Sequence, residues 1–132
     1  MISQAHSART PILSLPLKGE LDLRSAYKIL KYCNLEGIDI LDAHTAHAHT
    51  LGLLTKLFCP RLKLVVHRRV DFIPAGHYFN RLKYLNKRVD HYVAISKAIS
   101  EVLVKFGIEA NKITVAPSAV DSRGFFDFAR SA

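Results

Sequence analysis

The run of residues 89–121, VDHYVAISKAISEVLVKFGIEANKITVAPSAVD, constrains the fold more than any other part of the sequence. An apolar strand is predicted over 91–95, and Ser96 is well suited to cap the helix that follows. In that helix apolar residues recur at i, i+3, i+4 and i+7, and Gly107 can adopt the left-handed conformation that ends a helix. A second strand is predicted over 113–116. This strand–helix–strand unit predicts a parallel α/β sheet, whose ligands usually bind beyond the carboxyl ends of the strands.

The same alternation extends through the rest of the chain. Short apolar runs and helical spacing predict further strands over 12–17, 38–41 and 64–66, and helices over 23–35, 46–58 and 78–88. The apolar face of the helix 46–58 is predicted to consist of Thr50, Leu53, Leu54, Leu57 and Phe58. Strands that alternate with helices pair in parallel, so the predicted fold is α/β, a Rossmann-like parallel sheet flanked by helices.

The positive charge of the chain is concentrated in one segment. The formal net charge is +8, while the segments 1–55 and 89–132 each balance their acidic and basic residues. The segment 56–88 has one acidic residue, Asp71, against the basic residues Lys56, Arg61, Lys63, Arg68, Arg69, Arg81, Lys83, Lys87 and Arg88. Such a field attracts an anionic partner, either phosphate groups, an acidic glycolipid surface or nucleic acid. The alternative is a solvated helix face with ordinary surface lysines.

Three motifs, taken in their order along the chain, resemble a known family. They are IDILDAHT at 38–45, LVVHRRVDFIP at 64–74 and ITVAPSAVD at 113–121. Together they resemble the N-terminal domain of group 1 (family 4) glycosyltransferases, over residues 10–122. The resemblance implies a GT-B fold and the transfer of a sugar, with retention of configuration, from a nucleotide-sugar donor to a polysaccharide or lipopolysaccharide-type acceptor. It implies no metal ion and no cofactor, the nucleotide sugar being a co-substrate.

The resemblance also implies an incomplete domain. Residues 1–122 correspond to part of the acceptor-side N-terminal domain, and residues 117–132 to the start of the interdomain linker and a tail. The glycines of the sequence are isolated, so the glycine-rich turn that opens a nucleotide-binding half is not found. We therefore expect a fragment or truncated gene product that is inactive alone, marginally stable and prone to aggregate. The expected location is the cytoplasm, with peripheral contact at the inner membrane face.

His67 is the candidate catalytic residue. It follows the apolar strand 64–66, where α/β proteins bind ligands, although this position also fits an ordinary strand-end histidine. In the family that the chain resembles, a histidine at this place lies beside the donor sugar. Hydrogen-bond donors and positive charge in such a site stabilise the diphosphate leaving group.

Candidate substrate-binding residues lie near it in the sequence or at other strand ends. Arg68 and Arg69 could hold an anionic acceptor through their guanidinium groups, or one of them could cap the sheet edge. Asp71 either pairs with an arginine, which we favour, or bonds an acceptor hydroxyl. Ser96 precedes a helix and could bind an anion there, although the simpler role is that of an N-cap.

Three neighbouring histidines, at positions 44, 47 and 49, raise the question of a metal site. His47 and His49 stand two positions apart on the predicted helix and so point about 200° apart. Zinc needs three or four converging ligands, and we therefore predict no metal site. By resemblance, His44 and Thr45 instead line the substrate cleft. The family often has His-Ala-His where this chain has Asp42-Ala43-His44, which leaves the role of position 42 open.

Two further groups of residues have predicted roles. By resemblance, the interdomain hinge includes Pro117, Ser118 and Asp121. The predicted helix 78–88 combines aromatic residues with a basic set, namely Arg81, Lys83, Lys87 and Arg88. This combination predicts peripheral contact with an anionic membrane surface. The alternative is a helix that packs on the sheet and leaves a solvated basic face.

A basic module that binds nucleic acid or phosphate is the competing function. It predicts an affinity that falls steeply with salt. The sequence contains no recognition-helix, zinc-finger, ribonucleoprotein or GXXG motif, which makes nucleic acid the weaker alternative. We therefore favour a glycosyltransferase domain whose partners are a nucleotide sugar and a glycan or glycolipid acceptor.

Overall fold

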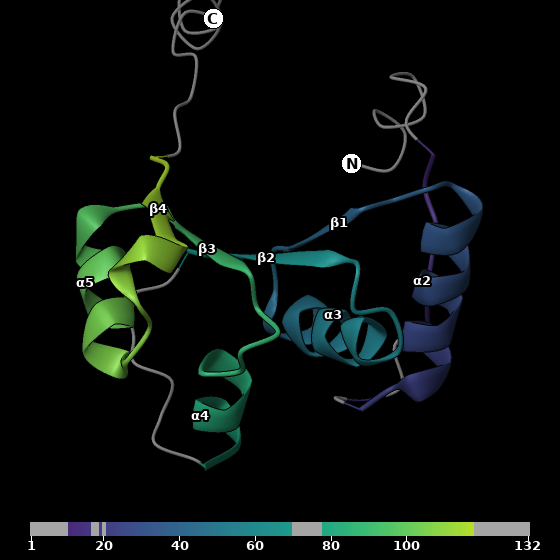
Figure 1. Cartoon of the computed structure of the whole chain (residues 1–132), viewed down its shortest axis with the longest axis horizontal. Coiled ribbons are helices and arrows are strands. Elements are labelled where there is room, and N and C mark those ends of the chain that lie inside the picture. The colour runs from purple at the N-terminus through teal and green to yellow at the C-terminus, as the bar shows by residue number, and fades with distance from the viewer. Residues whose placement is uncertain (1–10, 17–18, 20, 70–77, 118–132) are drawn as a thin grey trace, which may run out of the picture.

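The structure, a computed structural model, describes residues 11–16, 19, 21–69 and 78–117. Four parallel strands form one sheet in the order β1-β2-β3-β4, flanked by helices (Figure 1). The elements are α2 (Leu23–Leu35), β1 (Ile40–Ala43), α3 (Ala46–Phe58), β2 (Lys63–Arg68), α4 (Tyr78–Tyr84), β3 (His91–Ala94), α5 (Lys97–Phe106), the 3₁₀ helix η1 (Ala110–Lys112) and β4 (Ile113–Val115). The predicted α/β, Rossmann-like fold class is confirmed.

The helices that follow β1 and β3 begin at side chains that cap them. Thr45 accepts a hydrogen bond from the Ala48 amide at 3.1 Å, and Ser96 accepts one from the Ile99 amide at 3.2 Å. These bonds satisfy amides that have no partner within the helix. α5 ends at Gly107, whose φ of 111° is left-handed. The predicted cap at Ser96 and the predicted helix end at Gly107 are confirmed.

The two sides of the sheet differ in what covers them. Leu64 and Val66 of β2 and Tyr92 and Ala94 of β3 are buried and pack with α5 residues in the main core. In the view of Figure 1, α3 and α4 lie beneath this side of the sheet. Because side chains alternate along a strand, the residues between them point to the other side. That side, here called the open face, carries Ile40, Asp42, Val65, His67 and Val93, none of which is buried.

A buried ion pair fastens α3 to the sheet. The Lys56 ammonium, in a residue that is 7% exposed, donates to the Asp90 carboxylate. The same carboxylate accepts the Leu64 amide at 2.8 Å and lies 3.5 Å from the Lys63 ammonium. Since Asp90 directly precedes β3, these contacts join α3, β2 and β3. A buried ammonium requires such a partner, because its transfer out of water is otherwise strongly unfavourable.

The predicted strand over 12–17 is wrong for residues 12–16, which adopt no regular secondary structure, and residue 17 lies outside the described residues. Ile12 and Leu13 are exposed. A strand is stable when its amides and carbonyls pair with a neighbouring strand. In the sheet as described, β1 is an edge strand that pairs with β2, and the segment 12–16 does not extend it.

The predicted helix over 78–88 is too long, because α4 ends at Tyr84. The Asn86 side chain accepts a hydrogen bond from the Arg88 amide at 3.0 Å, two residues further on. Such a side-chain turn competes with the helical hydrogen bonds of the backbone. Lys87 and Arg88 therefore do not belong to the helix, which shortens the predicted basic face.

The apolar face predicted for α3 is right for Leu53, which packs against the main core, and wrong for Leu57 and Phe58. Leu57 and Phe58 are exposed, and an apolar groove of about 550 Å³ between α3 and α4 is lined in part by Thr50, Leu53 and Leu54. The residues that α3 buries are His49, Leu51, Gly52, Thr55 and Lys56. Lys56 and Gly52 explain why α3 turns this side toward the sheet. The ammonium of Lys56 bonds to Asp90, and Gly52 has no side chain to separate the helix from Leu64, which a Cβ would approach to 2.5 Å.

Candidate functional site

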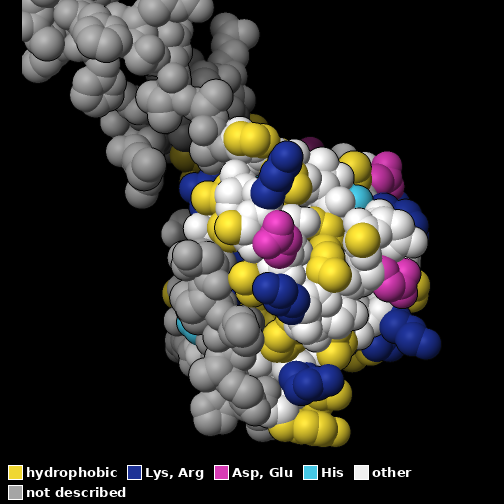
Figure 2. All heavy atoms as spheres, turned by 90° about the vertical axis from the view of Figure 1, so that its left-hand side faces the viewer, with side chains coloured by type: hydrophobic (Ala, Val, Ile, Leu, Met, Phe, Trp, Pro, Cys, Tyr) yellow, Lys and Arg dark blue, Asp and Glu magenta, His cyan; other side chains and the backbone are white. Residues whose placement is uncertain are grey.

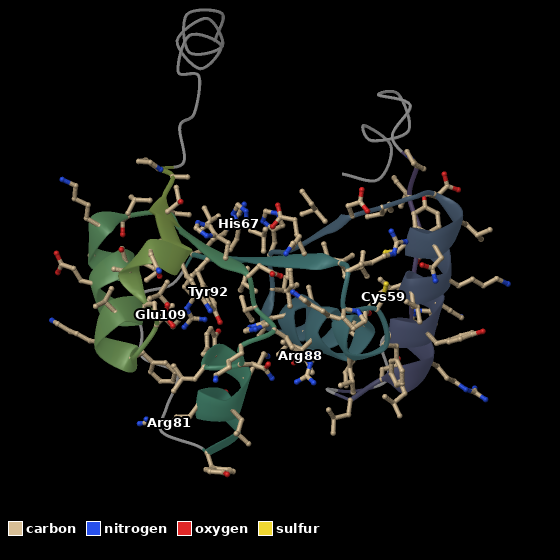
Figure 3. The ribbon with its side chains drawn as sticks, viewed as in Figure 1. Cys59, His67, Arg81, Arg88, Tyr92 and Glu109 are labelled. Atoms are coloured by element: carbon tan, nitrogen blue, oxygen red, sulfur yellow. The ribbon has the colours of Figure 1, made fainter. Side chains whose placement is uncertain are left out.

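Three titratable side chains meet at the carboxyl ends of β1 and β2. Asp42 lies in β1, His44 follows that strand, and His67 lies in β2. Asp42 and His44 are two positions apart and so point to the same side. The parallel register of β1 with β2 then places His44 beside His67. All three reach the open face, and Figure 3 shows His67 on the side of the sheet opposite to Tyr92.

The polar atoms of this Asp–His–His cluster converge. His67 Nε2 lies 3.1 Å from Asp42 Oδ1, and His44 Nε2 lies 3.2 Å from Asp42 Oδ2. The two imidazole rings stack, with centroids 4.2 Å apart and planes inclined by 27°. The side chain of His67 is 22% exposed, and those of Asp42 and His44 are each 46% exposed. The cluster can therefore offer hydrogen-bond donors and a carboxylate to a ligand that arrives from solvent.

Arg68 points away from this cluster. Its Nη1 donates to the Tyr84 hydroxyl at 2.8 Å, and its guanidinium carbon lies 5.3 Å from the centre of the same ring. Tyr84 is buried in the core, on the helix-covered side of the sheet. The contact joins β2 to α4. It uses the Arg68 guanidinium, which was predicted to hold an anionic acceptor. That role of Arg68 stays a prediction.

The other predicted substrate-binding residues are spread over several strand ends. Arg69 is exposed just after β2, and Asp71 lies outside the described residues. Thr45 and Ser96 have structural roles as the caps of α3 and α5. Neither the place of Thr45 in a substrate cleft nor anion binding at Ser96 is tested by these contacts, and both stay predictions.

The predicted hinge and the predicted basic surface fall partly outside the structure. Pro117 is exposed after β4, whereas Ser118 and Asp121 lie outside the described residues. Lys83 Nζ bonds to the Ala46 carbonyl at 2.6 Å, while the exposed basic residues of this region are Arg81, Lys87 and Arg88. Within the part of the chain that the structure describes, no helix has both the length and the apolar character needed to cross a membrane.

Part of the positive charge of the segment 56–88 is paired within the protein. Several basic residues have partners there: Lys56 and Lys63 contact Asp90, Arg61 contacts Asp39 and Asn34, and Arg68 contacts Tyr84. Figure 2 shows the face that carries α5, where basic, acidic and hydrophobic side chains are interspersed. A nucleic-acid-binding surface is expected to be a basic patch or stripe. On the face that Figure 2 shows, the described residues form no such patch.

His49 is a titratable residue whose environment the sequence analysis missed. Its exposed fraction is 1%, and neither ring nitrogen has a hydrogen-bond partner among the described residues. The ring packs edge-to-face on Tyr84 and Tyr92, with centroid distances of 5.1 and 6.3 Å. Burial, assisted by the charges of Lys83 and Arg68, lowers the pKa of His49 to about 3, so this imidazole is neutral at pH 7. The sequence pattern did not indicate that His49 would be buried without hydrogen-bond partners among the described residues.

His49 also bears on the trio of histidines considered for zinc. His49 is buried beneath the sheet, whereas His44 and His47 are exposed. The predicted divergence of His47 and His49 is therefore confirmed. A different residue, Asp42, stands beside His44 and His67. The sequence shows that Asp42 stands two residues before His44. Its contact with His67 follows only from the register of β1 with β2.

The sequence matches a known family over nearly its whole length. Residues 3–123 match the model of Glycosyltransferase Family 4, and the chain belongs to this family. The family that the three motifs resemble is thereby confirmed. Among curated proteins, none matches the sequence.

Solved structures share the fold at low sequence identity. Anabaena Alr3699/HepE in complex with UDP has a TM-score of 0.67 and 17% identity over 98% of this chain. The same protein with UDP and glucose has a TM-score of 0.65 and 18% identity over 91% of the chain. The S. aureus MnaA–UDP structure has a TM-score of 0.60 and 18% identity over 87%. The chain spans 38%, 34% and 33% of the lengths of these structures, about a third in each case.

Proposed function

We propose that this chain is the acceptor-side domain of a retaining glycosyltransferase that transfers a sugar from a nucleotide-sugar donor to a polysaccharide or lipopolysaccharide-type acceptor. The single observation that carries the proposal is the Asp–His–His cluster on the open face, at the carboxyl ends of β1 and β2. This is the edge of a parallel sheet where ligands bind in α/β proteins. The family of the chain supports the same function, as do the UDP and glucose bound in a structure with a similar fold.

The chemistry of the cluster suits this reaction without requiring a metal ion. Departure of a nucleoside diphosphate leaves positive charge on the sugar and negative charge on the phosphates. With both ring nitrogens protonated, His67 can donate Nε2–H to Asp42 and Nδ1–H to the sugar or its leaving group. Preorganised donors of this kind stabilise a transition state. Asp42 would hold the His67 ring in one orientation, since its carboxylate lies 3.1 Å from Nε2. His44 stacks on that ring and restricts it further.

Replacement of His67 by alanine tests the proposal. In the full gene product, we expect His67→Ala to lower sugar transfer by about 100-fold, the typical effect of removing one preorganised donor. Transfer is measured as incorporation of labelled sugar from a panel of nucleotide sugars, UDP-glucose first, into a glycolipid extract. His91→Ala is the matched control, because His91 lies at the other end of the sheet and contacts Thr114 at 2.8 Å.

Two outcomes would overturn the proposal. Full activity of the His67→Ala variant would remove His67 from the reaction. The absence of transfer from any nucleotide sugar, together with tight oligonucleotide binding at physiological salt, would instead favour the nucleic-acid-binding alternative.

We also propose that the domain works at the cytoplasmic face of the membrane, through the exposed residues Arg81 and Lys87. A basic surface beside exposed apolar side chains, such as Leu82, suits contact with anionic lipids. In a vesicle sedimentation assay, Arg81→Gln combined with Lys87→Gln should weaken binding to anionic vesicles, because each charge contributes about 1 kcal/mol near such a surface. Neutral vesicles are the control. Equal binding by the variant and the unaltered chain would contradict this contact.

A further inference from the structure

We propose that Asp42, His44 and His67 form a binding site for a divalent transition-metal ion of the zinc class. From the sequence, the trio His44, His47 and His49 was predicted not to bind a metal. The structure buries His49 and places Asp42 and His67, rather than His47, beside His44. This inference does not rest on the proposed sugar transfer, because metal binding is measured without any sugar or nucleotide.

The spacing of the donor atoms is the first argument. Two ligands bound to one tetrahedral zinc ion at about 2.0–2.1 Å lie about 3.3 Å from each other. Here His67 Nε2 and His44 Nε2 lie 3.1 and 3.2 Å from the two oxygens of Asp42. One ligand atom from each of the three residues lies within 4.8 Å of the others. The two imidazole rings are stacked, so metal binding requires them to turn until their Nε2 lone pairs converge on one ion.

The backbone also holds the three ligand residues in place, which favours metal binding. Asp42 and His67 belong to adjacent hydrogen-bonded strands, whose backbones fix the separation of the two side chains. His44 stands between β1 and the Thr45 cap of α3, so its backbone is also held. A site on paired strands loses less conformational entropy on binding than one built on free loops. The exposed sides of Asp42 and His44 give an ion a path from solvent.

The chemistry of the donor set selects the metal. Two imidazole nitrogens and one carboxylate suit zinc, copper and nickel, whereas magnesium and calcium prefer oxygen ligands. Three protein ligands leave at least one coordination position for water or a ligand oxygen. An ion bound here would occupy the atoms of His67 and Asp42 that face the open side of the sheet. The site therefore predicts that a zinc-class ion competes with any other ligand of these side chains.

Calorimetric titration of Zn²⁺ into the full 132-residue chain, without a histidine purification tag, tests the site. We expect one ion per chain and no heat from Mg²⁺. Asp42→Asn, His44→Ala and His67→Ala should each weaken Zn²⁺ binding by at least about tenfold, the lower end of the loss seen when metal-site residues are replaced. His91→Ala is the matched control and should bind as the unaltered chain does. Circular dichroism of each variant confirms that it is folded.

Cobalt substitution separates this site from the two thiols, Cys33 and Cys59, which are buried and unpaired. A Co²⁺ spectrum without a sulfur-to-metal band supports nitrogen and oxygen ligands. The proposal is overturned if a folded triple variant, lacking all three side chains, binds Zn²⁺ as tightly as the unaltered chain. It is equally overturned if the Co²⁺ spectrum shows thiolate ligation.

Discussion

Replacing Asp90 with alanine is expected to lower the free energy of unfolding by about 3 kcal/mol. This is the lower end of the usual effect of removing one partner of a buried ion pair, because Lys56 is buried but the Asp90 side chain is 29% exposed. The substitution leaves the Lys56 ammonium buried without its carboxylate and leaves the Leu64 amide without its acceptor. Such a loss is a large share of the roughly 5–15 kcal/mol that stabilises a typical domain. Urea unfolding followed by circular dichroism measures it.

The chain provides a matched control and a rescue. Asp39 pairs with Arg61 at 3.2 Å on the surface, so Asp39→Ala should change stability by less than about 1 kcal/mol. Combining Asp90→Asn with Lys56→Met removes both charges and should recover much of the loss. If Asp90→Ala were no more destabilising than Asp39→Ala, the buried pair would have no special role. If Asp90→Ala fails to fold, the double variant still reports on the pair.

Acid should weaken the same contact. Burial alone would raise the pKa of Asp90, but the hydrogen bonds from Lys56 and the Leu64 amide, with the charges of Lys56 and Lys63, outweigh it and hold this pKa below its usual range. A lowered folded-state pKa gives stability that is present above the unfolded-state value, about 3.9, and is lost as the pH falls further. The contribution of Asp90 is therefore complete at pH 7.

His49 should also make stability fall as the pH decreases, over a higher pH range than Asp90 does. With a folded-state pKa of about 3, against about 6.5 in the unfolded chain, the unfolded state binds one more proton between these values. Stability then decreases by about 1.4 kcal/mol per pH unit as the pH falls from about 6 to about 4. We expect His49→Leu, which is similar in size and cannot be protonated, to remove this slope.

Replacement of His49 should also stabilise the chain at pH 7, because the substitution removes two buried nitrogens that lack partners among the described residues. Urea unfolding at several pH values measures both effects. The matched control is His47→Leu in the same helix, at an exposed position, which should keep the slope of the unaltered chain. An unchanged slope in His49→Leu would show that His49 is protonated in the folded state.

The parts of the fold that the sequence predicts are those set by neighbours along the chain. The bounds of α2 and α3 agree with their predicted ranges, and Ser96 and Gly107 delimit α5, because caps and helical spacing act locally. The predicted helix over 78–88 was too long because of a local turn at Asn86, whereas two other wrong predictions concern distant partners. A strand over 12–17 depends on a neighbouring strand for its hydrogen bonds. The face that α3 buries depends on Asp90 and Leu64, which lie in other elements.

The candidate site shows the same division. His67 and His44 could be selected from their places after apolar strands, helped by the family resemblance. The part played by Asp42 could not be selected, because its carboxylate meets His67 only through the register of β1 with β2. The direction of Arg68 likewise depends on the buried ring of Tyr84, which belongs to a later helix. Register and packing depend on two elements together, so the sequence of either element alone does not predict them.

The open face has a consequence for how this domain can change over evolutionary time. Leu41, Leu64 and Val66 hold the helices in place, while Asp42 and His67 alternate with them along the same two strands and reach the uncovered side. Substitutions at the alternate positions can therefore alter ligand chemistry without repacking the helices. One strand pair thus carries the core side chains and the reactive groups at alternate positions, on opposite sides of the sheet.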